Sequence, residues 1–290
     1  MNAAALTYER ACGAARIEFK ARPDGHTALA DLYQRAPCRV LFPEPEADDL
    51  VQAVLLTTTG GLTGGDQVRV DVDVRAGARV TVTTQAAEKI YRALAHDSAS
   101  KIDIGMTVEA GSWAEWLAQE TILFNGARLR RGLHAEVSRR GRLLAVESLV
   151  LGRTAMGECF DTGFLHDAWR IRRDGRLIWA DALHMPSGIT GLRADRFGFG
   201  TAVACSTLVY VGDDIARQLA AARQLLSDSR ILRENPRSIT GAATALDGLL
   251  LVRLLADDPA RLRSAVTELI CGIRQSAGGL PPRLPRVWHC

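Results

Sequence analysis

The sequence lacks the features that would place it in a membrane or on a secretory route. No apolar run approaches the roughly 18 residues that a transmembrane helix requires. Residues 1–20 do not combine a basic start with an apolar core, as a signal peptide would. We therefore expect a cytoplasmic protein without a membrane partner.

The sequence also lacks a large excess of charge of either sign, because the formal net charge is only +3 over 290 residues. Specific nucleic-acid binders usually concentrate more positive charge than this, so we expect no nucleic-acid partner. The short basic clusters are interpreted as solvated strand faces; they are Arg128, Arg130 and Arg131, then Arg139, Arg140 and Arg142, then Arg170, Arg172 and Arg173.

Motifs for a tightly bound metal or cofactor are missing as well. The six cysteines form no CxxC pair, and their wide spacing predicts reduced thiols, several of them buried. No HExxH motif or zinc-spaced His/Cys cluster occurs. His289 and Cys290 end the sequence and together could grip a metal, although a mobile tail is the simpler interpretation.

The first half of the sequence is dominated by period-two alternation of apolar and polar residues. It runs through residues 68–74, 102–108 and 133–137. Such alternation predicts strands with one face on a core. The segments DVRAGARVTV, VEAGSWAEWL, VSRRGRLLAV and IRRDGRLIWA repeat a strand–turn–strand unit, with glycines at Gly77, Gly111, Gly141 and Gly175 spaced 34, 30 and 34 residues apart. A stacked, solenoid-like β architecture and a sandwich of long hairpins explain this repeat equally well.

The last third of the sequence changes to helical patterning. A helix is predicted over residues 213–227 with Asp213 or Asp214 as its cap, and a second begins at Asp258-Pro259. Residues 249–255 between them form an apolar run of strand or buried-helix length, and the proline-containing tail from Gly278 is predicted to be non-helical. We expect a single, mainly β domain over residues 1–290: a two-layer β body (1–210), about two helices with an intervening strand (211–275) and an extended tail (276–290).

The segment GGLTGGD holds four glycines before an aspartate: Gly60, Gly61, Gly64, Gly65 and Asp66. Glycine-rich loops can cradle phosphate, but a phosphate loop needs Gly-Lys-Ser/Thr leading into a helix, and here an aspartate and a strand follow. The glycines are therefore interpreted as a backbone device with positive φ or close backbone approach.

Several polar side chains interrupt apolar strands or end them. Glu147 lies in LLAVESLVLG and Asp181 in LIWADALHM, while Thr84 and Gln85 close a strand ahead of Lys89 and Tyr91. A buried carboxylate costs several kcal/mol unless it is paired, protonated or coordinating. A salt bridge to an arginine is the simpler interpretation; the functional one is a water-filled passage whose oxygen ligands bind a late first-row divalent ion weakly.

Four long runs resemble the UreD (UreH) family of urease accessory proteins. They are TTTGGLTGGDQVRVDVDVRAGARVTVTTQAAEKIYRA (57–93), QETILFNGARLRRGLHAEV (119–137), LLAVESLVLGRTAMGE (143–158) and LPRVWHC (284–290). Trp288 matches the family's Pro-Arg-(Ile/Val)-Trp ending, whereas the final His-Cys departs from it.

The resemblance implies a non-catalytic scaffold of stacked β layers. It implies direct binding to UreF, to the GTPase UreG through UreF, and to apo-urease, with nickel passing transiently through an internal tunnel. Carried onto this sequence, Asp66, Glu147 and Asp181 become the candidate tunnel lining, with Thr84 and Gln85 secondary. The competing hypotheses are a β-solenoid enzyme that uses Glu147 and Asp181 as an acid–base pair, and a plain structural β module.

Overall fold

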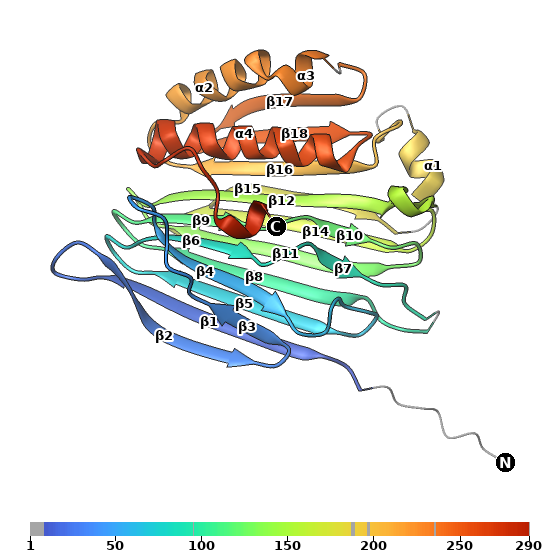
Figure 1. The fold of residues 1–290 in the computed structure, drawn as a ribbon, viewed down its shortest axis with the longest axis horizontal. Coiled ribbons are helices and arrows are strands. Elements are labelled where there is room, and N and C mark those ends of the chain that lie inside the picture. Colours follow the sequence, from blue (N-terminus) through green and yellow to red (C-terminus); the bar gives the residue numbers. More distant parts are fainter. Residues whose placement is uncertain (1–8, 95, 187–188, 196–197, 235, 290) are drawn as a thin grey trace.

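The computed structural model describes residues 9–94, 96–186, 189–195, 198–234 and 236–289. The molecule is mainly β, with two sheets face to face and helices against one of them (Figure 1). This confirms the predicted fold class. None of the helices in the described ranges combines the length and the apolar character needed to cross a membrane.

One layer, sheet A, has seven strands. They are β1 (Cys12–Ala21), β2 (Thr27–Arg35), β5 (Gln67–Val74), β8 (Ser100–Val108), β11 (Arg128–Val137), β14 (Phe164–Arg173) and β15 (Arg176–Met185). Their order is β15-β14-β11-β8-β5-β1-β2, with parallel pairing from β14 to β1 and antiparallel strands at both edges. The predicted alternation is realised here, because valines of β5 are buried while the residues between them face outward.

The other layer, sheet B, has eleven strands. They are β3 (Cys38–Leu41), β4 (Val51–Thr57), β6 (Arg79–Thr84), β7 (Glu88–Ile90), β9 (Trp113–Leu117), β10 (Thr121–Leu123), β12 (Arg142–Arg153), β13 (Glu158–Cys159), β16 (Ala204–Val211), β17 (Ile239–Leu246) and β18 (Leu249–Ala256). The main order is β17-β18-β16-β12-β9-β6-β4-β3, with the short strands β10 and β13 paired to β12 and β7 paired to β10. Strand β12 is buried along almost its whole length because it has a layer on each side.

The sequence repeat corresponds to coils that cross between the sheets. In three repeats the glycine turn links a strand of sheet A to one of sheet B: β5 to β6, β8 to β9, and β11 to β12. In the fourth, the turn at Gly175 closes the antiparallel β14–β15 hairpin within sheet A. The architecture is therefore coiled in its middle and hairpin-like at its edge. The solenoid-like interpretation describes the middle, and the hairpin interpretation describes the edge.

The helical part is larger than expected. It contains α1 (Ile189–Ala194), α2 (Ile215–Asp228), α3 (Arg230–Glu234) and α4 (Pro259–Gly278), besides 3-10 turns η1 (Thr154–Met156) and η2 (Arg286–His289). The start of α4 is as predicted, because the Asp258 carboxylate accepts the Ala260 N–H and Pro259 opens the helix. Asp214 precedes α2 but makes no capping bond; its carboxylate instead accepts from the Tyr210 hydroxyl and the Gln218 amide.

Two predictions for this region need correction. Not one but two strands lie between the long helices, because β17 was missed ahead of β18. The tail was predicted to be non-helical, yet η2 forms at Arg286–His289, beyond the last proline, where nothing blocks a helical turn. Cys290 lies outside the described residues, and the five described cysteines are free thiols.

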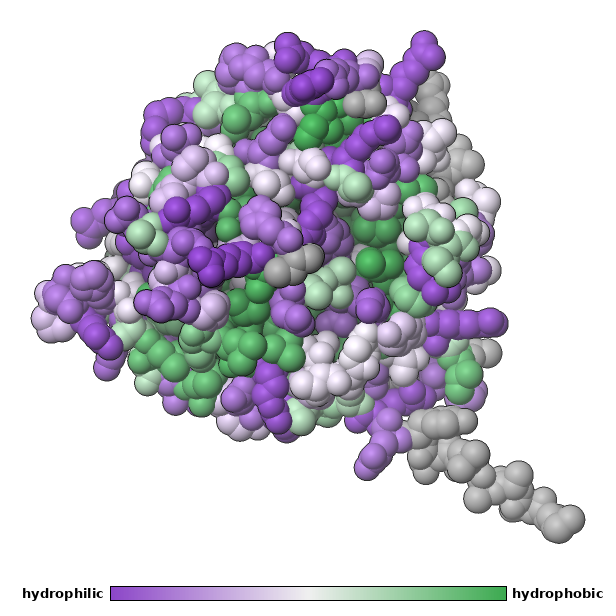
Figure 2. All heavy atoms as spheres, viewed as in Figure 1, coloured by the Kyte–Doolittle hydropathy of each residue, from purple (hydrophilic) through white to green (hydrophobic). Residues whose placement is uncertain are grey.

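Two apolar layers hold the molecule together, one between the sheets and one between sheet B and the helices. In the second layer the fully buried Arg274 of α4 bonds Glu115 of sheet B at 2.9 Å and Asp49 at 2.5 Å. On the face shown in Figure 2, apolar side chains interrupt the polar surface where Figure 1 places β3, and Leu41 and Phe42 there are exposed.

Candidate functional site

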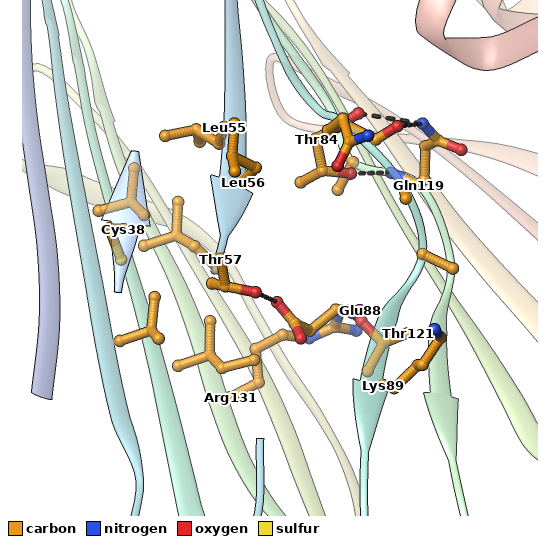
Figure 3. Close-up of a pocket in the computed structure, with 18 of the residues that line it drawn as sticks. Cys38, Leu55, Leu56, Thr57, Thr84, Glu88, Lys89, Gln119, Thr121 and Arg131 are labelled. Atoms are coloured by element: carbon orange, nitrogen blue, oxygen red, sulfur yellow. Dashed lines mark hydrogen bonds between the residues drawn. The ribbon is translucent and has the colours of Figure 1, made fainter. Parts of the chain in front are cut away.

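A cavity of about 220 Å³ lies between the sheets, behind a gap in sheet B (Figure 3). The gap arises because the parallel pairing of strands β4 and β6 stops at Leu55 and Thr84, after which the two segments diverge. Apolar side chains of β5 and β8 form the wall contributed by sheet A. The polar lining is Thr57, Thr84, Gln85, Glu88, Lys89, Gln119, Thr121, Arg131 and Glu147.

The base of the cavity is a buried cluster of one arginine and two carboxylates. The Arg131 guanidinium of β11 donates to both oxygens of Asp167 at 2.8 Å, to the Thr121 hydroxyl at 2.9 Å and to Glu147 of β12. The other Glu147 oxygen accepts the Trp116 indole N–H at 2.8 Å. Glu147 thus has the arginine partner that the sequence favoured, and both of its oxygens are engaged.

Charge within this cluster does not balance, since two carboxylates share one guanidinium. Burial raises the pKa of Glu147 and the neighbouring Asp167 raises it further, while Arg131 opposes both. The charges of Asp167 and Glu147 in turn raise the pKa of Arg131 against the effect of its burial, so it stays a cation. The raised pKa favours the neutral form of Glu147, which offsets that imbalance, and the cluster offers no free ligand.

Glu88 at the start of β7 is the other carboxylate that lines the cavity. Its Oε2 accepts the Thr57 hydroxyl at 3.2 Å, which bridges the gap between β4 and β7 (Figure 3). Burial raises the pKa of Glu88 to about 7, although that hydrogen bond and Lys89 oppose the shift. Glu88 is therefore close to half ionised near neutral pH, and a nearby cation would favour its ionised form.

The opposite wall connects the cavity to the C-terminal tail. The Gln119 side-chain amide donates to the carbonyls of Thr84, Gln85 and Val287 at 3.0 to 3.1 Å. Trp288 is buried beside it, with its indole N–H on the Thr83 hydroxyl at 3.0 Å. The tail is thus part of the structure that shapes this wall.

The glycine block lies at the cavity rim and has the structural role expected from the sequence. Gly60, Gly61 and Gly65 adopt positive φ, and a Cβ on Gly61 would lie 2.7 Å from the Lys89 carbonyl oxygen. A Cβ on Gly64 would lie 2.6 Å from the Cβ of Asp97. The Tyr91 hydroxyl donates to the Gly60 carbonyl at 2.8 Å, which ties the block to β7.

Asp66 is not among the residues that line the cavity. Its two oxygens accept backbone N–H groups of Ala11 and Thr63, each at 2.8 Å. The carboxylate therefore closes the turn after the glycines and fixes the strand start. Its assignment to a tunnel stays a prediction that the contacts of Asp66 do not support.

Asp181 lies elsewhere, in a groove of about 420 Å³ between β15 and the strands β16–β18. Its carboxylate is half-exposed and pairs with Arg253 of β18. Glu147 and Asp181 therefore belong to separate cavities and do not form the facing pair that the enzyme hypothesis requires. Within the described ranges, no group of three or more His, Cys, Asp or Glu side chains is placed to hold a metal ion.

Sequence reasoning missed Arg131 and Asp167 as site residues. Arg131 had been interpreted as part of a solvated face, but it is 3% exposed. Its position is in phase with the buried Leu133, Ala135 and Val137, and Asp167 is in phase with Leu165 and Trp169. The alternation of buried and exposed positions along each strand is the signal that would have placed both side chains inside.

Comparison with known proteins shows a match along almost the entire chain. Residues 11–289 match the family model described as UreD urease accessory protein. A protein of Rhizobium leguminosarum bv. viciae named urease accessory protein UreD is 39% identical over 289 residues, which is 99% of this chain and 98% of that protein. Proteins with the same name in Magnetococcus marinus and Granulibacter bethesdensis are 37% and 41% identical, covering 99% and 86% of this chain and 99% of each relative.

Proposed function

Because the chain belongs to the UreD family of urease accessory proteins, which act in urease maturation, we propose that it passes nickel through the cavity between its sheets. In this proposal the chain is a non-catalytic chaperone in the cytoplasm. It binds UreF directly, reaches the GTPase UreG through UreF, and docks on apo-urease, where GTP-dependent nickel insertion takes place. Nickel is a cargo in transit and no cofactor is tightly bound.

The observation that carries this proposal is the polar lining of an otherwise apolar cavity. Glu88 offers carboxylate oxygens next to the Thr57 hydroxyl, and Glu147 of the Arg131 cluster also lines the cavity. Oxygen ligands hold late first-row divalent ions weakly compared with imidazole or thiolate. Such a lining suits an ion that must leave again.

The test is urease activation in cells that co-express apo-urease, UreF and UreG with nickel. Glu88→Gln keeps the size of the side chain and an acceptor for Thr57 but removes the charge, so the nickel content of purified urease should fall several-fold. Glu44→Gln, at an exposed acidic position away from the cavity, should leave it unchanged. Retention of UreF in a pull-down separates lost passage from lost assembly.

A second series tests the three residues that the family resemblance pointed to. Full activation by Asp66→Ala, Glu147→Leu and Asp181→Leu, each with normal UreF binding, would refute their assignment to the lining. Loss only in Glu147→Leu would restrict the passage to the cavity described above. Failure of the wild-type chain to retain UreF at low salt would contradict the chaperone proposal itself.

A further inference from the structure

Two histidines face each other on the outer side of sheet A, away from the cavity. His166 of β14 and His184 of β15 are direct partners in the antiparallel register. Their Nδ1 atoms lie 3.4 Å apart, and the rings meet edge-on with centroids 5.3 Å apart. Leu165 and Asp167 on either side of His166 are buried, so strand alternation directs the imidazoles to the solvent side.

The distance between these nitrogens matches the spacing of two ligands on one metal ion. Metal–imidazole bonds of about 2.0–2.1 Å place two nitrogens about 2.8–3.0 Å apart at octahedral angles and about 3.3–3.4 Å apart at tetrahedral angles. At present one Nδ1 can donate its hydrogen to the other. A divalent cation bound by both Nδ1 atoms would take the place of that hydrogen, which would move through solvent to Nε2 of the same ring.

Neighbouring side chains hold this geometry. The Phe164 ring packs edge-on against His184 with centroids 5.6 Å apart. The guanidinium groups of Arg128 and Arg130 lie 5.6 Å from the centre of the same Phe164 ring. Aromatic and cation–π contacts of this kind limit the orientations open to the ring of His184, which favours a preformed pair of ligands.

Nearby positive charges limit how tightly the two imidazoles can hold a cation. Burial lowers the pKa of His166, and the positive charges of Arg130 and Arg170 lower it further against the effect of Asp167. Guanidinium groups therefore disfavour additional positive charge at this position. The same guanidinium charges repel a divalent cation, so bound metal would exchange readily.

We propose that His166 and His184 form a two-imidazole site for an exchangeable, late first-row divalent cation on the outer face of sheet A. Water completes the coordination shell, since two protein ligands leave positions open. Sheet A separates this site from the cavity, because His166 points outward while the adjacent Asp167 belongs to the Arg131 cluster. The proposal does not depend on nickel passage through the cavity.

The test is titration of the purified full-length chain, carrying a tag without histidines, with Ni²⁺ and Zn²⁺ in a calorimeter. His166→Ala and His184→Ala should each weaken one binding event at least tenfold, because removing either ring destroys the chelate. Cu²⁺ bound to the wild-type chain should show two imidazole nitrogens by electron paramagnetic resonance, and one in each variant. Metal held elsewhere contributes equally to all of these chains.

Two further variants make the outcome decisive. His134→Ala removes an exposed imidazole of β11 on the same face and should change nothing. Arg130→Gln should tighten binding, since it removes a repelling charge beside the pair. Equal titrations of wild type, His166→Ala and His184→Ala would overturn the proposal, and thermal unfolding of each variant verifies that the exposed substitutions leave the fold intact.

Discussion

At the scale of single residues, the two carboxylates that line the cavity differ in their hydrogen-bond and ion-pair partners. Glu147 is fixed by Arg131 and Trp116, whereas Glu88 accepts the Thr57 hydroxyl across the gap in sheet B and has no arginine partner among the described residues. Removing one partner from a buried ion cluster leaves uncompensated charge and typically costs about 3–5 kcal/mol. A substitution at Arg131 or Glu147 therefore reports on folding as well as on the cavity, while Glu88 permits a separate test of charge.

Glu88 should make the stability of the protein depend on pH. Its folded pKa of about 7 lies above its ordinary value of 4.5, so the folded chain binds this proton more tightly than the unfolded chain. The stability from this group is present below about pH 4.5 and is lost as pH rises through about 7. We expect Glu88→Gln to gain about 1–2.5 kcal/mol relative to wild type between pH 5 and pH 8, measured by urea unfolding.

Glu109 provides a control because its pKa is shifted in the opposite direction. Hydrogen bonding to Arg75 lowers the pKa of Glu109, so this group is ionised in both states over the same interval. The difference between Glu109→Gln and wild type should therefore stay constant from pH 5 to pH 8. A constant difference for Glu88→Gln as well would show that the Glu88 carboxyl is not desolvated.

At the scale of the elements, the glycine block determines how the chain enters the cavity rim. Gly60 and Gly61 are neighbours with different surroundings: a Cβ on Gly60 meets nothing within 4 Å, whereas on Gly61 it meets the Lys89 carbonyl oxygen at 2.7 Å. Gly60→Ala should cost about 1 kcal/mol from positive φ alone. Gly61→Ala should cost at least about 2 kcal/mol more because backbone must move, as measured by urea unfolding.

The same pair of variants separates two explanations of the glycines. Equal losses for Gly60→Ala and Gly61→Ala would mean that only backbone conformation matters there. The expected inequality would mean that β7 must approach the block closely, as its contacts with Gly61 indicate.

Elements with strong local patterns could be predicted, and those defined by distant partners could not. The valines of β5 and the Asp258-Pro259 start of α4 carry their own signals. By contrast, ITGAATAL of β17 is short of apolar alternation and becomes a strand by pairing with β18. The turn at Gly175 resembles the other three in sequence, and whether it crosses between sheets depends on which strand the chain meets next.

The candidate site was predictable to a similar, limited degree. Glu147 stood out as a carboxylate within an apolar strand, and Thr84 and Gln85 as polar residues that end one. Their convergence on one cavity depends on the gap between β4 and β6, which no local pattern encodes. The Asp181–Arg253 pair joins residues 72 positions apart, so its location in a separate groove could not be inferred locally.

At the scale of the whole molecule, sheet B is shared by both apolar layers. Leu143 and Leu144 of β12 are adjacent and fully buried, but Leu143 packs between the sheets while Leu144 packs under the helices. A strand that serves both layers couples them, so loss of one layer exposes the other face of β12. This arrangement predicts one cooperative folding unit, and the single domain stays a prediction.

Leu143→Ala and Leu144→Ala should therefore shift one common unfolding transition. Each deletion should cost about 2–5 kcal/mol, because each leaves a cavity in a closed layer. Far-ultraviolet circular dichroism and tryptophan fluorescence should give coincident curves for wild type and both variants. If the helical layer were an independent unit, Leu144→Ala would move only a separate transition and leave the β signal in place. The opposite orientation of two adjacent side chains thus makes them matched probes of whether the β body and the helices fold together.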